Sequence, residues 1–153
     1  MIETTGDTTF EATGACLCGR VSYKAAFRPS AGACHCGMCR KWCGGPLMSI
    51  HAVGPVSFQG AEHIGTYSSS EWAERGFCKH CGSGLYYHLL PQPAVPDGEY
   101  IMSAGTLSDQ SMLIFDHEVY VDHAPGWYHF SGDEQRKRMT EADIMAMYGA
   151  SAD

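Results

Sequence analysis

The sequence lacks the features by which membrane proteins and nucleic-acid-binding proteins are usually identified. It has no run of about eighteen apolar residues, so no membrane-spanning helix is expected. Lys and Arg number 10 against 17 Asp and Glu, which gives a formal net charge of −7. The basic residues form no stripe that would hold a phosphate backbone. We therefore expect neither a membrane nor a nucleic acid as a partner.

An export signal is also missing. Residues 1–7, MIETTGD, are acidic and polar, without the basic flank and apolar centre of a signal peptide. We expect a cytoplasmic protein whose residues 1–8 are frayed. In a reducing compartment, 8 cysteines indicate metal ligation. A disulfide-stapled secreted domain is the less favoured alternative, because it would need the missing signal.

The chain is expected to be one mainly β domain. Its 153 residues can bury a sizeable core, and 44% of them are apolar, as in globular proteins. Short alternating stretches separated by Gly and Pro predict antiparallel strands. We predict short twisted antiparallel sheets tied together by metal over residues 9–132. A C-terminal helical tail over residues 133–153 should pack on this domain or trail from it.

The same signals predict the individual elements. Arg28-Pro29-Ser30 should break the strand pattern, and residues 38–43 should form a single helical turn. The tail helix should begin with Thr140 as N-cap and stop at Gly149. The predicted strands cover residues 9–15, 20–27, 47–53, 56–59, 63–68, 85–90, 99–104 and 115–121.

Four cysteines in two pairs predict a closed structural zinc site. Cys16 and Cys18 fall at the expected tip of one hairpin, and Cys78 and Cys81 at the tip of another. Cysteines this close in sequence make strained disulfides but comfortable chelates, and four thiolates are a usual ligand set of structural zinc. A metal that joins the pairs would also restrain the long segment between them.

Three further cysteines, Cys34, Cys36 and Cys39, lie close enough in sequence for one tight turn to bring them onto one metal ion. Three protein ligands and one open position are the arrangement of catalytic zinc. Cys43 would share a helical face with Cys39 and could close this site as a fourth ligand. We favour the alternative, in which Cys43 packs as a small apolar residue and the position stays open.

The histidines are not expected to bind metal. His35 lies between two of the predicted ligands, so its ring should point away from the metal, and His80 is placed in the same way between Cys78 and Cys81. The others are scattered, and each taken alone is expected to be structural or on the surface. They are His51, His63, His88, His117, His123 and His129.

Three segments resemble the successive motifs of the glutathione-dependent formaldehyde-activating enzyme family. They are GACLCGRV at 14–21, CHCGMCRK at 34–41 and FCKHCGS at 77–83, and the stretch at 115–127 fits the closing part of the family pattern. The resemblance implies the zinc-tied, Mss-four-like β-tent fold. It also implies two Zn²⁺ per chain, a structural one on Cys16, Cys18, Cys78 and Cys81 and a second on Cys34, Cys36 and Cys39.

The activity that this resemblance implies is the addition of glutathione to formaldehyde, which is carbon–sulfur lyase chemistry. Zinc with an open position would bind the incoming thiol as its thiolate. The sequence identifies no general acid or base and no residue that anchors glutathione. Arg40, Lys41 and Arg75 are candidates for meeting its carboxylates, but each is equally suited to balancing thiolate charge or facing solvent.

Two functional hypotheses therefore remain. The first is a zinc-dependent lyase or thiol-adduct enzyme that acts on a small thiol such as glutathione, with the second zinc as its centre. The second is a non-catalytic, zinc-stabilised β module that binds a protein or small-molecule partner. The second gains weight if Cys43 completes the site of Cys34, Cys36 and Cys39. The oligomeric state does not follow from the sequence.

Overall fold

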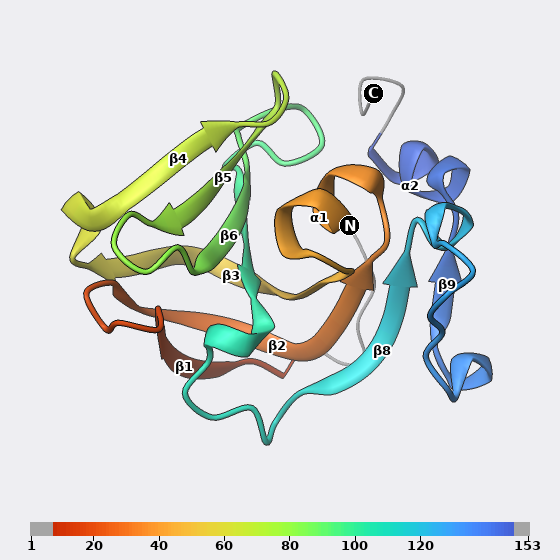
Figure 1. The fold of residues 1–153 in the computed structure, drawn as a ribbon, viewed down its shortest axis with the longest axis horizontal. Helices are drawn as coiled ribbons and strands as arrows, with labels where there is room; N and C mark the ends of the chain where they lie inside the picture. The colour runs from red at the N-terminus through yellow and green to blue at the C-terminus, as the bar shows by residue number, and fades with distance from the viewer. Residues whose placement is uncertain (1–7, 149–153) are drawn as a thin grey trace.

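A computed structural model describes residues 8–148 of the chain. Most of the expected frayed segment, residues 1–8, and the helix stop expected at Gly149 lie outside the described residues. The fold is mainly β, as predicted, with strands in one mixed sheet and two short helices (Figure 1). The strands are β1 (Phe10–Ala15), β2 (Ser22–Cys34), β3 (Leu47–Gln59), β4 (Ile64–Ser68), β5 (Ala73–Cys78), β6 (Gly84–Leu89), β7 (Glu99–Ser103), β8 (Ile114–Val119) and β9 (Lys137–Met139).

The sheet runs in the order β4-β5-β6-β7-β3-β2-β8-β9, and β1 pairs with β2 beside this path. Most pairs are antiparallel, as predicted. However, β8 pairs parallel with β2, and β9 pairs parallel with β8. A parallel neighbour requires a long connection, and the chain between β2 and β8 supplies it with the whole β3–β7 half of the sheet. β8 therefore lies beside the far end of β2, where Cys34 is.

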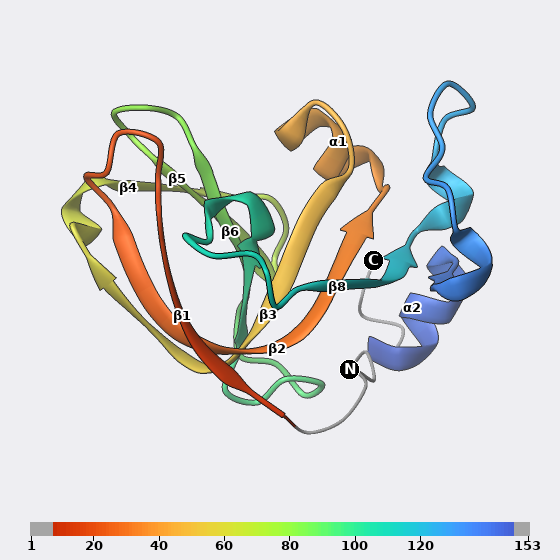
Figure 2. The ribbon, with the colours of Figure 1, turned by 90° about the horizontal axis from the view of Figure 1, so that it is seen from below.

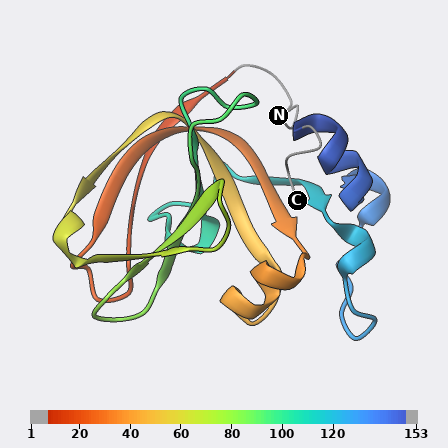
Figure 3. The ribbon, with the colours of Figure 1, turned by 90° about the horizontal axis from the view of Figure 1, so that it is seen from above.

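The prediction that Arg28-Pro29-Ser30 breaks the strand pattern was wrong, because β2 continues through these residues to Cys34. Its pairing with β3 shifts between Phe27 and Ala31, as at a β-bulge. A second shift, between Lys24 and Ala26, lies opposite the Gly-Pro at 54–55, which had been expected to separate two strands. Bulges bend strands, and Figures 2 and 3 show β2 and β3 strongly curved.

The helices begin and end at the expected kinds of residue. α1 (Gly37–Cys43) has Cys36 as its N-cap and ends at Gly44, whose φ is 77°. α2 (Glu141–Tyr148) begins after Thr140, as predicted. The Asp143 backbone N–H donates to the Thr140 hydroxyl at 3.3 Å, and Asp143 accepts from the Thr140 N–H at 2.9 Å, which is a capping-box arrangement. Single 3-10 turns lie at Ala61–His63, Ala104–Thr106, Val121–His123 and Asp133–Gln135.

The main hydrophobic core lies between the curved strands β1, β2, β3, β6 and β7. Its least exposed members include Val21, Phe27, Ile50, Leu85 and Met102. Two cysteines expected to bind zinc, Cys16 and Cys78, belong to the same buried cluster, so the end of the core is closed by thiols. Within residues 8–148, no helix is long and apolar enough to cross a membrane.

The close approach of Gly60 to the start of β2 gives a test of the fold. Gly60 and Gly54 both have positive φ, 77° and 82°, but an added Cβ at Gly60 would lie 1.9 Å from the Arg20 carbonyl oxygen, whereas none at Gly54 meets an atom within 4 Å. We expect Gly54→Ala to lower the free energy of unfolding by about 1 kcal/mol through backbone strain. Gly60→Ala should cost about 3 kcal/mol or more, because a backbone oxygen must also move. Equal losses in urea unfolding would contradict this packing.

Candidate functional site

The first thiol cluster joins two hairpin tips. Cys16 and Cys18 lie in the turn between β1 and β2, Cys78 is the last residue of β5, and Cys81 lies in the turn that follows. All four sulfurs are within 4.8 Å of one another. The Sγ–Sγ distances are 3.6 Å for Cys16–Cys18 and 3.7 Å for Cys18–Cys78. Four sulfurs placed tetrahedrally at about 2.3 Å from zinc lie about 3.8 Å apart, whereas a disulfide measures about 2.05 Å. The spacing fits a metal ion.

Backbone N–H groups and one hydroxyl form hydrogen bonds with the sulfurs of this cluster. The Val21 N–H donates to the Cys16 sulfur at 3.3 Å, and the Cys81 N–H donates to the Cys78 sulfur at 3.5 Å. The Ser83 hydroxyl lies 3.1 Å from the Cys81 sulfur, and this contact contributes most to lowering the pKa of Cys81 to about 5. Metal ligation requires deprotonated thiols, so this environment suits a cation.

The second cluster contains Cys34, Cys36 and Cys39, whose sulfurs also lie within 4.8 Å of one another. Cys34 is the last residue of β2, Cys36 caps α1, and Cys39 lies in the first turn of α1. The Cys39 N–H donates to the Cys36 sulfur at 3.4 Å. The three thiols are thus held in place by a strand end and a helix start, which are rigid elements.

Cys43 does not join the second cluster. It ends α1 and is exposed, so the prediction that it packs as a small apolar residue was wrong. The cluster formed by the described residues contains the other three thiols without it. Nor does this cluster contain any described His, Asp or Glu as a fourth member. The two groups therefore differ as predicted, with four thiols in one and three in the other, and both can hold a metal ion.

Without a metal, the second cluster concentrates its negative charge on one sulfur. Hydrogen bonds from the thiols of Cys34 and Cys39 lower the pKa of Cys36 to about 2, while hydrogen bonding to Cys36 and burial raise the pKa of Cys34 well above its usual value. Three thiolates this close repel one another, so only one ionises easily. All three ionise together only with a cation between them.

Arg75 supplies part of the compensating charge. Its side chain is 3% exposed, and Nη1 and Nη2 each lie 3.7 Å from the Cys39 sulfur. The guanidinium also lies over the Tyr87 ring, 4.8 Å from its centroid. Arg75 therefore balances thiolate charge, one of the roles left open by the sequence. Arg40 is also engaged, because its Nε donates to the His35 carbonyl at 2.9 Å.

His35 holds the loop of the second cluster in place from behind. As predicted, its ring points away from the cysteines; it is 2% exposed. Nε2–H donates to Glu118 at 2.8 Å, and Nδ1 lies 2.8 Å from the Tyr128 hydroxyl. The other Glu118 oxygen accepts from Arg136 Nε at 3.0 Å. Sequence reasoning missed this buried network, because its partners are far from His35 in the chain.

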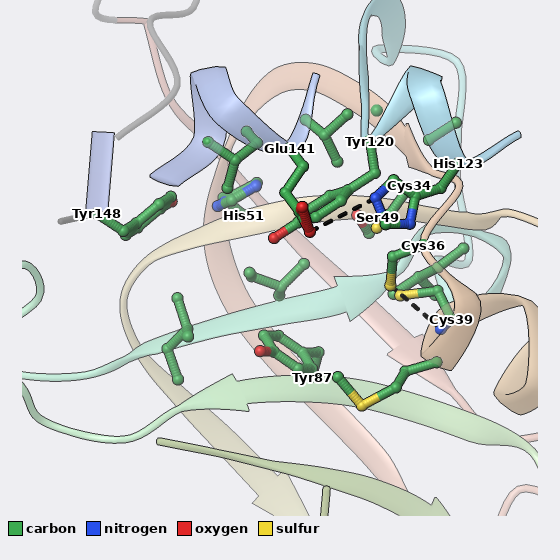
Figure 4. Close-up of a pocket in the computed structure, with 18 of the residues that line it drawn as sticks. Cys34, Cys36, Cys39, Ser49, His51, Tyr87, Tyr120, His123, Glu141 and Tyr148 are labelled. Atoms are coloured by element: carbon green, nitrogen blue, oxygen red, sulfur yellow. Dashed lines mark hydrogen bonds and ion pairs between the residues drawn. The ribbon is translucent and has the colours of Figure 1, made fainter. Parts of the chain in front are cut away.

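The second cluster opens onto a cavity of about 530 Å³ (Figure 4). The cysteines lie at one end of the group of side chains drawn, and Tyr148 lies toward the other. Alternate residues of the sheet form one wall, since residues two apart on a strand share a face. This wall includes Leu47, Ser49 and His51 of β3, Tyr87 and Leu89 of β6, Ile101 of β7, and His117 and Val119 of β8; Glu141, Ile144 and Tyr148 of α2 also line the cavity.

Three histidines that were expected to be scattered meet in this cavity: His51, His117 and His123. The expected alternation of β8 already placed His117 and Val119 on one face. The signal that was missing was the order of the strands, which brings β3 and β8 to either side of β2. His63, His80 and His88 do not line the cavity.

Two comparisons with known proteins agree with this architecture. The family model of the glutathione-dependent formaldehyde-activating enzyme matches residues 11–123, which contain both thiol clusters. The chain is also similar to a protein of the fission yeast Schizosaccharomyces pombe, strain 972, named as an uncharacterized lyase. The two are 36% identical over 124 residues, which cover 79% of this chain and 86% of the yeast protein.

The buried ion pair of Glu118 gives a prediction for the site's support. We expect Glu118→Gln to lower the free energy of unfolding by about 3 kcal/mol at pH 7, because Arg136 is left buried without its counterion. Glu11→Gln, which removes an exposed ion pair with Lys24, should change it by less than about 0.5 kcal/mol.

The pH dependence of this loss follows from the pKa of Glu118. Burial alone would raise this pKa, but hydrogen bonds from His35 and Arg136 outweigh burial and lower it. A lowered carboxyl pKa stabilises the fold above the unfolded value of 4.5, and this contribution disappears as the pH falls through the folded pKa. Urea unfolding should therefore show a smaller difference in the free energy of unfolding between the wild-type protein and Glu118→Gln in acid than at pH 7. A difference that is constant with pH would contradict an ionised Glu118.

Proposed function

The chain belongs to the glutathione-dependent formaldehyde-activating enzyme family, and on that premise we propose that it is a zinc-dependent lyase acting on the adduct of a small thiol and an aldehyde. Glutathione is the thiol that the family description suggests. The observation that supports this proposal best is the position of Cys34, Cys36 and Cys39, which lie at a cavity of about 530 Å³. A purely structural metal site needs no such cavity.

We assign a structural zinc to Cys16, Cys18, Cys78 and Cys81, and a second zinc to Cys34, Cys36 and Cys39. The sulfur spacing, the N–H donors and the guanidinium of Arg75 support this ligand assignment. When bound, the second zinc would supply a lowered pKa for a thiol that reaches it. A fourth ligand from the chain is missing among the described residues around it.

The chain's own residues would position the reactants. Arg75 orients Cys39 and neutralises charge that would repel an incoming thiolate. The apolar side chains of Leu47, Leu89 and Ile101 would exclude water from the cavity. Formaldehyde and thiols combine unaided, so holding the two partners together is where such an enzyme can contribute most.

The lining of the cavity limits what it can anchor. Arg75 is the one Lys or Arg among the described residues that line it, and Arg75 is already engaged with Cys39. Glutathione carries two carboxylates, and neither would find a free cation deep in the cavity. This favours a small thiol whose reactive end enters while any charged end remains near the opening, by His123 and Glu141.

The experiment that tests the function is a thiol titration of cobalt-substituted protein. We expect thiols to change the thiolate-to-cobalt absorption, and the zinc protein to speed both formation and cleavage of the thiol–formaldehyde adduct. Cys39→Ser should abolish both effects. Cys43→Ser is the matched control and should abolish neither, because Cys43 lies outside the cluster. If no thiol changes the spectrum, the non-catalytic zinc module becomes the better description.

The two metals should also differ in retention. The four-thiol site links distant segments, and Cys18 and Cys78 are 60 residues apart, whereas the three-thiol site has fewer ligands. We therefore expect a mild chelator to remove one zinc per chain first, leaving a folded protein with the other. Zinc content measured against time should show a plateau at one equivalent. Simultaneous loss of both metals would contradict unequal coordination.

A further inference from the structure

Two imidazoles in the cavity, those of His51 and His117, are each held by a carboxylate. His51 Nδ1 lies 2.8 Å from Glu99, and His117 Nδ1 lies 2.7 Å from Asp116. A carboxylate accepts hydrogen bonds, so Nδ1 carries a proton in both rings, and the Nε2 of a neutral ring keeps its lone pair. Among the described residues, neither Nε2 atom has a hydrogen-bond partner. The ring centroids are 6.4 Å apart.

The backbone brings this pair beside the second thiol cluster. Gly32 of β2 pairs with Ser49 of β3 on one side and with His117 of β8 on the other. A Cβ at Gly32 would lie 2.1 Å from His117 Nε2, so the imidazole occupies the space that a side chain would fill. Gly32 is two residues before Cys34 and on the same face of the strand, so the Cα atoms of the two residues are about 7 Å apart.

The position of the pair suits a particular part of the reaction. In a thiol–aldehyde adduct whose sulfur lies at the cysteines, the hydroxyl oxygen would be two bonds away from that sulfur. His117 packs against Gly32, whose Cα is about 7 Å from the Cα of Cys34, and this separation is comparable to the length of a thiol, a carbon–oxygen bond and one hydrogen bond of about 2.8 Å. The alternative pair in the cavity, His123 and Glu141, is a third or more exposed and forms its own ion pair at 3.5 Å.

We propose that His51 and His117 form the oxygen subsite of this lyase, where they bind the hydroxyl of the thiol–aldehyde adduct and carry its proton. This inference rests on the proposed function. In adduct formation a sulfur–carbon bond forms and the carbon–oxygen π bond breaks. The proton lost by the thiol passes to His117 Nε2 and from there to the oxygen, and cleavage reverses each step. No oxidant or reductant is needed.

The surroundings of His117 keep it ready to accept a proton. Burial lowers its pKa, with smaller contributions from His51 of β3 and Lys137 of β9, against the opposing effect of Asp116 on its own strand. Ser30 of β2 adds a neutral hydroxyl that donates to Asp116 at 2.6 Å. The imidazole is therefore neutral at pH 7. Tyr87, which also lines the cavity, is protonated as well, because burial is the main cause that raises its pKa to about 12.

Binding can be measured apart from activity with two thiols of similar size, 2-mercaptoethanol and 1-propanethiol, which differ in one hydroxyl. We expect zinc- or cobalt-loaded protein to prefer 2-mercaptoethanol. In His117→Leu and His51→Leu that preference should fall about fivefold, the value of a hydrogen bond. Comparing the ratio of dissociation constants between variants cancels the different acidities of the thiols. His88→Leu is the matched control, because His88 is also carboxylate-held but lies outside the cavity.

Two further measurements complete the test. Adduct formation should slow about 100-fold in His117→Leu. The plot of its rate against pH should also lose the limb that reports protonation of the imidazole. His88→Leu should not slow the reaction. In wild-type protein, the ¹⁵N resonance of His117 Nε2 should shift with 2-mercaptoethanol and not with 1-propanethiol, which requires no variant to fold. If thiols bind the metal but none of these differences appears, the oxygen subsite is wrong and the lyase stands. If no thiol binds, the proposed function itself fails.

Discussion

Repulsion between crowded thiolates is the constraint on which the rest of the structure depends. Each cluster holds its sulfurs within 4.8 Å, a spacing that thiolates tolerate only around a cation or by giving up charge. Rigid parts of the fold hold the sulfurs at this spacing. Two hairpin tips meet to form the first cluster, while the end of β2 and the start of α1 form the second. Arg75, buried beside Cys39, reduces the repulsion further.

The second cluster becomes a site because of the strands around it. β2 and β3 stay paired on both sides of their bulges. Their later paired residues include Cys34 and residues next to His51, and both side chains line the same cavity. The parallel strand β8 then adds His117 to one side and carries Glu118, which fixes His35 behind the cluster. Part of this support, including Tyr128, Arg136 and α2, lies beyond the residues that match the family model.

Local spacing made part of this molecule predictable. The two thiol groups, the turn that became α1, and the cap at Thr140 each depend on residues within a few positions of one another. The parallel placement of β8 was not predictable, because alternation identifies the face of a strand and not its neighbour. For the same reason, the sequence did not predict that His51 and His117 line one cavity. The prediction that the strand breaks at Arg28-Pro29-Ser30 was wrong for another reason, because proline is tolerated at a bulge as well as at a strand end.

The order of the cysteines along the chain also has a consequence for biosynthesis. The three-thiol cluster is complete once residue 39 has left the ribosome, whereas the four-thiol cluster waits for residue 81, which is 42 residues later by subtraction. Under the zinc assignment proposed above, the ligand set of the second zinc is therefore the first to be complete in the nascent chain. The four-thiol set is completed later, once the turn after β5 has emerged, and it joins the β1–β2 hairpin to the β5–β6 hairpin.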